Sequence, residues 1–323
     1  MVGTPLDDEE IIELKIPLEL AGLRLDQAVA KAIPEYSRAR LQQWIKEGRL
    51  QVDGQPSPAK AKVYGGELIS LAPVLEDQDD WQAENIPLDI VFEDEALIVI
   101  NKPAGLVVHP AAGNRSGTVL NALLHHAPEL SKIPRAGIVH RLDKDTTGLM
   151  VVAKTLQAQK ALVEQLQARS VSREYVAVVH GVFVSGGTID APIGRHPQDR
   201  KKMAVREGGK EAITHYRIQE KLANFTVVNV KLETGRTHQI RVHMAHQRHP
   251  LIGDSVYGGR LRLPKGASDV LIEVLRGFSR QALHAQRLSL SHPSTEEMMG
   301  WSAGLPQDMQ TLINVLQQED HDA

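Results

Sequence analysis

An acidic stretch near residue 80 constrains how this chain of 323 residues can fold. Residues 76–95 carry nine acidic side chains and no basic one, and the overlapping run 74–84 has little apolar periodicity. A segment that cannot bury apolar surface behaves as a linker rather than as part of a core. We therefore expect five parts: an acidic segment at 1–21, a small domain at 22–75, the linker at 76–87, a large domain at 88–316 and a disordered acidic tail at 317–323.

Both expected domains are basic, although the whole chain is not. Residues 22–75 have a net charge of +3 and residues 96–316 one of +11, whereas the whole chain has −3. Basic surfaces attract polyanions. The charge pattern alone leaves two readings with equal weight, nucleic-acid binding and incidental placement of charges that keep the protein in solution.

Several classes of protein are excluded by what the sequence lacks. It contains no cysteine, which excludes disulfides, thiolate nucleophiles and cysteine-ligated metal centres and suits a reducing cytoplasm. No run approaches the roughly 18 apolar residues of a membrane span, and the first residues lack the pattern of a signal peptide. We expect a cytoplasmic monomer that is not attached to a membrane.

The small domain has the pattern of two helices and a short sheet. Residues 24–32 are helix-like, and Ser37 is a suitable N-cap for a second helix. Three apolar residues share one face of that second helix: Leu41, Trp44 and Ile45. The Asp53-Gly54 pair predicts a hairpin turn, and residues 67–71 read as a further strand.

Residues 23–55 resemble the S4 RNA-binding domain. The Arg-Leu-Asp start, the Ser-Arg-x-x-Leu second helix and the Gly-x-Leu-x-Val-Asp-Gly turn of that family are all present. A generic basic helical hairpin is the alternative reading. The resemblance implies an RNA-binding surface made by Arg24, Ser37, Arg38, Arg40, Lys46 and Arg49.

Strands outnumber helices in the large domain and do not alternate regularly with them. The strand-like runs are 98–101, 149–153, 175–184 and 225–232. The helix-like runs are 155–168, 270–275 and 309–316. This order predicts an α+β fold, with a mainly antiparallel sheet flanked by helices, rather than a doubly wound sheet.

The densest polar cluster is the loop HRLDKDTTG at 140–148, between two apolar strand-like runs. Its composition alone fits a polar hairpin that satisfies its own backbone, or a functional loop presented by a sheet. The order His-Arg-Leu-Asp and the missing glycine-rich phosphate loop exclude a protein kinase. A glycosidase pair formed by Asp143 and Asp145 stays a weak alternative, because only 4% of the residues are aromatic rings that could stack on sugars.

Four histidines form the strongest metal candidate: His238, His243, His246 and His249. Their spacing does not match the zinc motif HExxH, and no cysteine or nearby acidic residue completes the set. They also alternate with arginines, which is more typical of contacts to a polyanion. We expect no metal site.

Four blocks in a fixed order suggest one enzyme family. INKPAGLVVHP (100–110), HRLDKDTTG (140–148), SREYVAVVHG (172–181) and LETGRTHQIRVHMAHQRHPLIGDSVYGG (232–259) resemble the RNA pseudouridine synthases. The branch is the one whose active-site loop reads His-Arg-Leu-Asp-x-x-Thr-x-Gly. The resemblance covers nearly the whole chain, since some members carry an S4 domain at the N-terminus.

The resemblance implies both an activity and its residues. The expected reaction is the isomerisation of specific uridines in large-subunit (23S) ribosomal RNA, or in a large-subunit precursor particle, without a cofactor. Asp143 is the expected catalytic aspartate, Tyr175 lies against the target uracil, Arg241 pairs with Asp143, and Arg141 fills the gap left by the flipped nucleotide. The competing hypothesis is a non-catalytic RNA-binding protein with the same fold.

Overall fold

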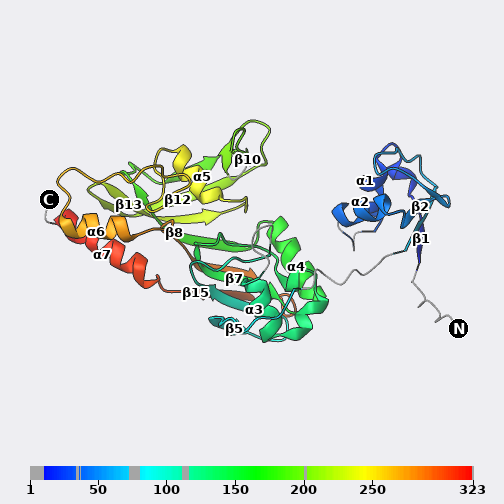
Figure 1. Ribbon diagram of the computed structural model, residues 1–323, viewed down its shortest axis with the longest axis horizontal. Coiled ribbons are helices and arrows are strands. Elements are labelled where there is room, and N and C mark those ends of the chain that lie inside the picture. Colours follow the sequence, from blue (N-terminus) through cyan, green and yellow to red (C-terminus); the bar gives the residue numbers. More distant parts are fainter. Residues whose placement is uncertain are drawn as a thin grey trace. The chain divides into compact units, whose positions relative to one another are not determined.

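The chain forms two compact units, residues 1–79 and 80–323, in a computed structural model (Figure 1). The structure describes residues 11–33, 36, 38–72, 81–110, 116–199 and 202–321. Residues 76–80 of the expected linker, Ser37 and the side chain of Arg40 lie outside the described residues. In the described part of the chain, no helix is both long and apolar enough to cross a membrane.

The small unit packs two helices against a four-stranded antiparallel sheet of order β1-β4-β2-β3. The helices are α1 (Leu25–Ala32) and α2 (Arg38–Lys46), and the strands are β1 (Ile12–Lys15), β2 (Leu50–Val52), β3 (Gln55–Pro56) and β4 (Leu68–Leu71). The predicted face of the second helix is confirmed, because Leu41, Trp44 and Ile45 are all buried.

The separation of residues 1–21 from the small domain is wrong for its described part. Strand β1 pairs with β4, and the 3-10 turn η1 (Leu18–Leu20) follows it. Ile12 and Leu14 pack against the core, while the alternate residues Glu13 and Lys15 are exposed. The alternation of apolar and charged residues over these four positions is the signal of an edge strand with one buried face. It was overlooked because the segment as a whole is acidic.

A buried carboxylate joins the two helices of the small unit. Asp26 lies in the first turn of α1 with none of its surface exposed. It accepts two hydrogen bonds of 3.0 Å from Arg24, bonds of 2.8 and 3.1 Å from Arg38, and one from Gln42. Burial alone raises the pKa of Asp26, but the hydrogen bonds from Arg38, Gln42 and Arg24 outweigh it and lower the pKa to about 2.

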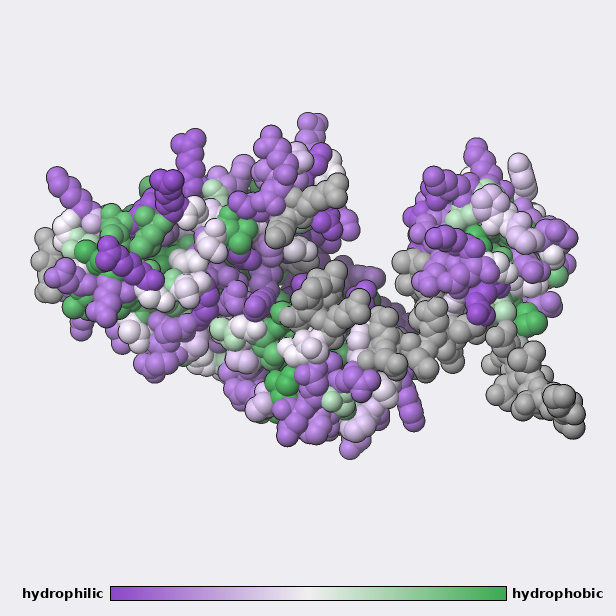
Figure 2. Space-filling model, viewed as in Figure 1, coloured by the Kyte–Doolittle hydropathy of each residue, from purple (hydrophilic) through white to green (hydrophobic). Residues whose placement is uncertain are grey.

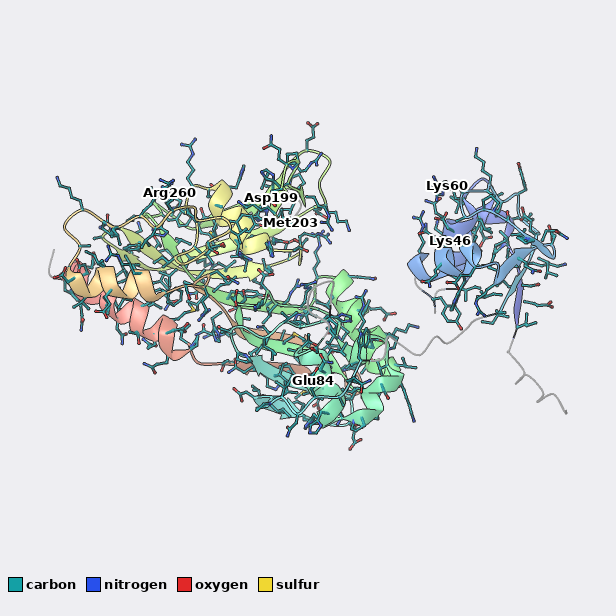
Figure 3. The ribbon with its side chains drawn as sticks, in the orientation of Figure 1. Lys46, Lys60, Glu84, Asp199, Met203 and Arg260 are labelled. Atoms are coloured by element: carbon teal, nitrogen blue, oxygen red, sulfur yellow. The ribbon has the colours of Figure 1, made fainter. Side chains whose placement is uncertain are left out.

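The basic surface of the small unit therefore contains two arginines held by Asp26 and further exposed basic residues. Arg24 and Arg38 are partly exposed, at 38% and 45% of their side chains, yet Asp26 fixes their direction. Lys46 and Lys60 lie on the surface of the same unit (Figure 3). Arg49 forms an ion pair of 3.5 Å with Glu47.

We predict that Asp26→Asn lowers the free energy of unfolding of the small unit by about 2 kcal/mol at pH 7. The depressed pKa stabilises the fold above the ordinary value of 3.8, and this contribution is lost as the pH falls toward 2. The measurement is urea unfolding of the full chain at pH 7 and pH 3, with α1 followed by pulsed hydrogen exchange. Glu47→Gln is the control, with an expected change below about 0.5 kcal/mol. Equal stability of wild type and Asp26→Asn at pH 7 would contradict the prediction.

The large unit is built on a nine-stranded sheet of order β5-β6-β7-β14-β8-β13-β12-β9, with β15 beside β14. Its strands are β5 (Ile90–Glu93), β6 (Leu97–Lys102), β7 (Thr147–Ala153), β8 (Ser172–His180), β9 (Gly187–Asp190), β12 (Ile213–Leu222), β13 (Phe225–Leu232), β14 (Leu283–Ser291) and β15 (Met298–Ser302). A separate hairpin pairs β10 (Ile193–Arg195) with β11 (Met203–Val205). Within the described sheet only β7 and β14 run parallel, so the α+β class and the mainly antiparallel sheet are confirmed.

Helices cover both faces of this sheet, and the alternation along β8 shows how. Val176 and Val178 pack under α6 (Asp269–Gly277) and α7 (Gln307–His321), which lie side by side (Figure 1). Tyr175, Ala177 and Val179 face the other way, toward α5 (Gln239–His246). The helices α3 (Val119–His126) and α4 (Leu156–Gln167) cover the β5–β7 side. The face visible in Figure 2 is mainly hydrophilic.

The prediction of a disordered tail at 317–323 is wrong as far as His321. Helix α7 extends to that residue, and Leu316 is buried in the core below the sheet. Gln317 donates hydrogen bonds of 3.0 and 2.9 Å to Glu220. The carboxylate of Glu319 accepts from the backbone and hydroxyl of Ser268, at 2.8 and 2.6 Å, at the N-cap of α6. Gln317 and the acidic Glu319 are therefore used in tertiary contacts.

Candidate active site

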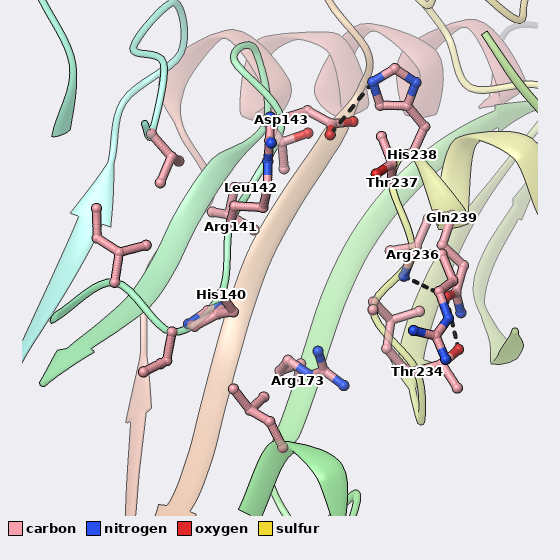
Figure 4. Close-up of a pocket in the computed structure, with 18 of the residues that line it drawn as sticks. His140, Arg141, Leu142, Asp143, Arg173, Thr234, Arg236, Thr237, His238 and Gln239 are labelled. Carbon is pink, nitrogen blue, oxygen red and sulfur yellow. Dashed lines mark hydrogen bonds and ion pairs between the residues drawn. The ribbon is translucent and has the colours of Figure 1, made fainter. Parts of the chain in front are cut away.

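A cleft of about 750 Å³ opens on the sheet face that carries Tyr175 (Figure 4). It lies between the 140–146 loop, which leads into β7, and the 233–238 loop, which leads into α5. The residues that line the cleft include His140, Arg141, Leu142, Asp143, Arg173, Tyr175, Leu232, Glu233, His238, Arg241 and Leu283.

The structure brings the expected site residues together from distant parts of the sequence. Arg241, on α5, donates from Nη1 to Oδ2 of Asp143 over 2.9 Å. Tyr175 is buried in the cluster that contains Leu142 and Leu283, and it lines the cleft. Arg141 lines the cleft as an exposed side chain. Asp145 is absent from the described lining, so the carboxylate pair required for a glycosidase is not presented to the cleft.

Arg241 is fixed by a carboxylate that the sequence analysis did not assign. Its Nε and Nη2 donate to the two oxygens of Asp254 over 2.7 and 2.9 Å, and Asp254 is only 3% exposed. Asp254 also accepts from the backbone of Val256 and Tyr257, each at 3.0 Å. The planar two-point grip is therefore on Asp254, while the third nitrogen reaches Asp143.

Arg241 remains a cation in this setting. Burial alone lowers the pKa of Arg241, but the hydrogen bonds and charges of Asp254 and Asp143 outweigh it and raise the pKa. Its guanidinium also lies 5.0 Å from the ring centre of Tyr257. A permanent cation beside Asp143 favours the ionised carboxylate.

His238 faces the second oxygen of Asp143. It adopts a left-handed backbone conformation, with φ of 57°, at the N-cap of α5, and its Nε2 lies 3.8 Å from Oδ1 (Figure 4). The Tyr257 hydroxyl accepts from the backbone of Met203 and contacts Nδ1 of His238 at 2.7 Å. Burial, which outweighs the opposing charge of Asp143, lowers the pKa of His238. We assign the remaining imidazole proton to Nε2, which makes it a donor toward Asp143.

Two cations hold the backbone that follows Asp143. The Lys102 ammonium is buried and donates to the carbonyls of Pro103, Leu106 and Lys144 over 2.7, 2.9 and 2.8 Å. Burial lowers the pKa of Lys102 to about 8, against the opposing charges of Asp145 and Asp143. Arg280 donates to the Asp145 carbonyl over 3.2 Å and is gripped by Asp308 at 2.6 and 2.8 Å. The loop is therefore held from its surroundings, unlike a polar hairpin that satisfies itself.

Glycine is required where this loop enters the sheet. Gly148 has a φ of 113°, and a Cβ there would lie 2.2 Å from the carbonyl oxygen of Ala285. The close approach allows the short parallel pairing of β7 with β14. This explains the last residue of the HRLDKDTTG motif.

The four candidate metal-binding histidines do not converge. Both ring nitrogens of His243 are hydrogen-bonded, to Thr214 at 2.8 Å and to the carbonyl of Ala191 at 2.9 Å. His249 contacts the carbonyl of His180 at 2.8 Å, and His238 faces Asp143. Across the described residues, no group of three histidines or acids is arranged to hold a metal ion.

We predict that Arg241→Lys strongly lowers turnover of the expected uridine isomerisation, with a modest change in RNA affinity. Lysine keeps the charge but loses the two-point hold of Asp254, and a displacement of about 1 Å at a reacting group costs on the order of 100-fold in rate. Single-turnover assays at saturating enzyme measure the rate, with Arg248→Lys, beyond the end of the same helix, as the control. A near-normal rate with weakened binding would remove Arg241 from the active site.

Comparisons with known proteins agree with this geometry. The family model described as RNA pseudouridylate synthase matches residues 96–246, and the S4 domain model matches residues 23–63. The chain is 58% identical to ribosomal large subunit pseudouridine synthase D of Pseudomonas aeruginosa, over 94% of this chain and 95% of that protein. It is 57% identical to the protein of the same name from Escherichia coli K12, over 91% of each chain.

A solved human structure, RNA pseudouridylate synthase domain containing 4, matches 71% of this chain and 92% of its own. That match has a TM-score of 0.56 at 27% sequence identity. Fold, motif residues and relatives therefore agree, and the chain belongs to the RNA pseudouridine synthase family, with an N-terminal S4 domain.

Proposed function

We propose that this enzyme converts specific uridines of large-subunit (23S) ribosomal RNA to pseudouridine during maturation of the large subunit in the cytoplasm. The observation that carries the proposal is the hydrogen bond of 2.9 Å between Arg241 and Asp143 at the cleft that also holds Tyr175. The names of relatives that are 54–58% identical over most of the chain support the substrate class.

The reaction is an isomerisation, so no atoms are gained or lost. The N1–C1′ bond breaks, the uracil turns, a C5–C1′ bond forms, and the proton lost from C5 is balanced by one gained at N1. The ionised Asp143 carboxylate acts at the sugar, as the nucleophile at C1′ or as the base that removes a sugar proton. Both roles require the negative charge that Arg241 stabilises.

The other cleft residues bind and orient the base. A base in a duplex or stack has to flip out before Asp143 can reach its sugar. The Tyr175 ring offers a stacking surface worth roughly 1–3 kcal/mol per base. Burial raises the pKa of Tyr175, so its hydroxyl stays protonated. Arg141, exposed beside the cleft, is placed to occupy the gap that the flipped nucleotide leaves.

We predict that Asp143→Asn abolishes turnover but leaves RNA binding largely intact, because the change is isosteric and removes only the charge. The measurement is pseudouridine formation in 23S ribosomal RNA by purified protein, together with an equilibrium binding assay. Asp145→Asn is the matched control and should keep most of the activity, since Asp145 does not line the cleft. More than a trace of product from Asp143→Asn would overturn the assignment. Binding without turnover by the wild-type protein would favour a non-catalytic RNA-binding protein.

The S4 unit supplies a second RNA contact in this proposal. Arg24 and Arg38 are held in place by Asp26, and Lys46 and Arg49 extend the same basic set. Such residues position RNA through phosphate and shape rather than through base identity. The Ser37 and Arg40 contacts suggested by the S4 resemblance remain proposals.

We predict that removal of residues 1–79 weakens RNA binding and target selectivity more than it damages the large unit. The cut precedes Trp81, whose ring lies 4.9 Å from that of His109, and Glu84, which accepts from Gly117 at 2.9 Å. The salt dependence of affinity should flatten by about 0.7–0.9 per lost phosphate contact. Binding titrations over a salt series and mapping of modified sites measure both effects. An unchanged salt slope with an unchanged site profile would assign the S4 unit another role.

A further inference from the structure

Arg173 is a buried cation without a carboxylate partner. It lies on β8, two residues before Tyr175, and is only 7% exposed. Among the described residues its side chain forms no ion pair and one hydrogen bond, from Nη2 to the Glu233 carbonyl over 3.2 Å. Its Nε is buried with no partner. The Glu233 carboxylate is already used by Arg169 and His215, at 3.0 and 2.6 Å.

This arrangement is unusual for the large unit and costs stability. The two other arginines that are buried among the described residues each grip a carboxylate, Arg241 on Asp254 and Arg280 on Asp308. A buried charge is normally paired, because desolvation without a partner is expensive. The guanidinium of Arg173 therefore has unused donors that an anion from outside the protein could fill.

The location of Arg173 identifies where that anion comes from. Side chains two apart on a strand share a face at a spacing of roughly 7 Å, so Arg173 and Tyr175 both face the cleft. In Figure 4 the guanidinium points from β8 toward the 234–236 loop. A Cβ on Gly235 would lie 2.8 Å from Nη1, so this glycine leaves the guanidinium its space. The distance between Arg173 and the Tyr175 ring is therefore within the length of a single nucleotide.

His140 adds a second donor at the same end of the cleft. Its Nε2 accepts the backbone N–H of Val151 over 3.0 Å. Burial and then the charge of Arg173 lower the pKa of His140 to about 3, so the ring is neutral and carries its proton on Nδ1. That nitrogen has no protein partner within the described ranges, and His140 lines the cleft. The open donors of Arg173 and His140 suit a phosphate oxygen, which only accepts hydrogen bonds.

We propose that Arg173, assisted by His140, forms a subsite for a backbone phosphate that flanks the flipped target uridine. The subsite rests on the proposed function and adds to it the place where the substrate backbone enters. Phosphate binding supplies the missing counter-charge, and it forms only when the target nucleotide is in the cleft.

The first test compares Arg173→Met with Arg287→Met. The Arg287 side chain is 66% exposed and lies 3.8 Å from Glu174. The Glu174 side chain leaves β8 on the face opposite Arg173 and Tyr175. We expect Arg173→Met to lower the second-order single-turnover rate constant about 10- to 100-fold, the range for one hydrogen bond to a charged group. Arg287→Met should leave it unchanged.

Thermal unfolding of the RNA-free variants separates this role from a structural one. Removal of an unpaired buried charge should leave the melting temperature of Arg173→Met equal to or above that of wild type. A lower melting temperature together with a lower rate would overturn the proposal, because both are expected of a purely structural arginine. A normal rate would overturn it as well.

A substrate with one neutral linkage tests the contact directly. Two test RNAs each carry a single methylphosphonate, one at the linkage before the target uridine and one at the linkage after it, next to a 2′-O-methyl sugar. Each control RNA has the same 2′-O-methyl sugar and an ordinary phosphodiester. For the wild type, one of the two neutral linkages should cost as much as Arg173→Met, and the combination should cost no more than either change alone. Additive losses would overturn the subsite.

Equilibrium binding of wild type and Arg173→Met to the charged and neutral-linkage RNAs tests whether the subsite exists, independently of turnover. If the wild type fails to modify the fully charged RNA, the proposed function fails, while the binding comparison still judges Arg173. If the wild type modifies it and Arg173→Met behaves like wild type in rate and affinity, only the subsite fails.

Discussion

The active site depends on one guanidinium held between two carboxylates. Asp254 fixes the plane of Arg241 through two hydrogen bonds of 2.7 and 2.9 Å, and this leaves the third nitrogen directed at Asp143 over 2.9 Å. A point charge at the same place would stabilise the ionised carboxylate without fixing its direction. Because His238 is the N-cap of α5 and Arg241 lies within the helix, one short segment directs a donor toward each oxygen of Asp143.

The loop that carries Asp143 is positioned through its backbone rather than through its side chains. Lys102 and Arg280 donate to the carbonyls of Lys144 and Asp145, and both cations are anchored in or beside the sheet. Carbonyl groups accept from a buried cation whatever the side chain of the residue, so the acidic and basic side chains of the loop stay available for substrate. The same packing explains why the loop enters β7 through Gly148, where a Cβ would collide with β14.

The sequence predicted those features that have a local period or a motif. The helix at 155–168 and the strand at 225–232 are found as predicted, because burial follows the period of a single element. Within that strand Val228, Val230 and Leu232 are buried and the residues between them are exposed. The role of Asp254 was not predictable in this way, because the loop after α5 has to fold back along the helix before Asp254 can contact Arg241. Strand β1 was missed because the acidic composition of residues 1–21 was read as a segment outside the small domain. The end of α7 was missed because the acidic tail was read as disordered, although Gln317 and Glu319 bond to neighbouring elements.

Charge is distributed unevenly along the cleft, and this gives it a direction. At one end Asp143 and Asp254 are balanced by Arg241 and by the exposed Arg141, with a neutral His238 beside them. At the other end Arg173 carries an uncompensated positive charge. A nucleotide has a neutral base and sugar and a negative phosphate. The field in a low-dielectric cleft therefore favours the orientation with the phosphate toward Arg173 and the sugar toward the carboxylate. The reverse orientation would place the phosphate against Asp143 and leave the buried guanidinium unpaired. The charge that makes the protein less stable without RNA thus selects the orientation in which the reaction can occur.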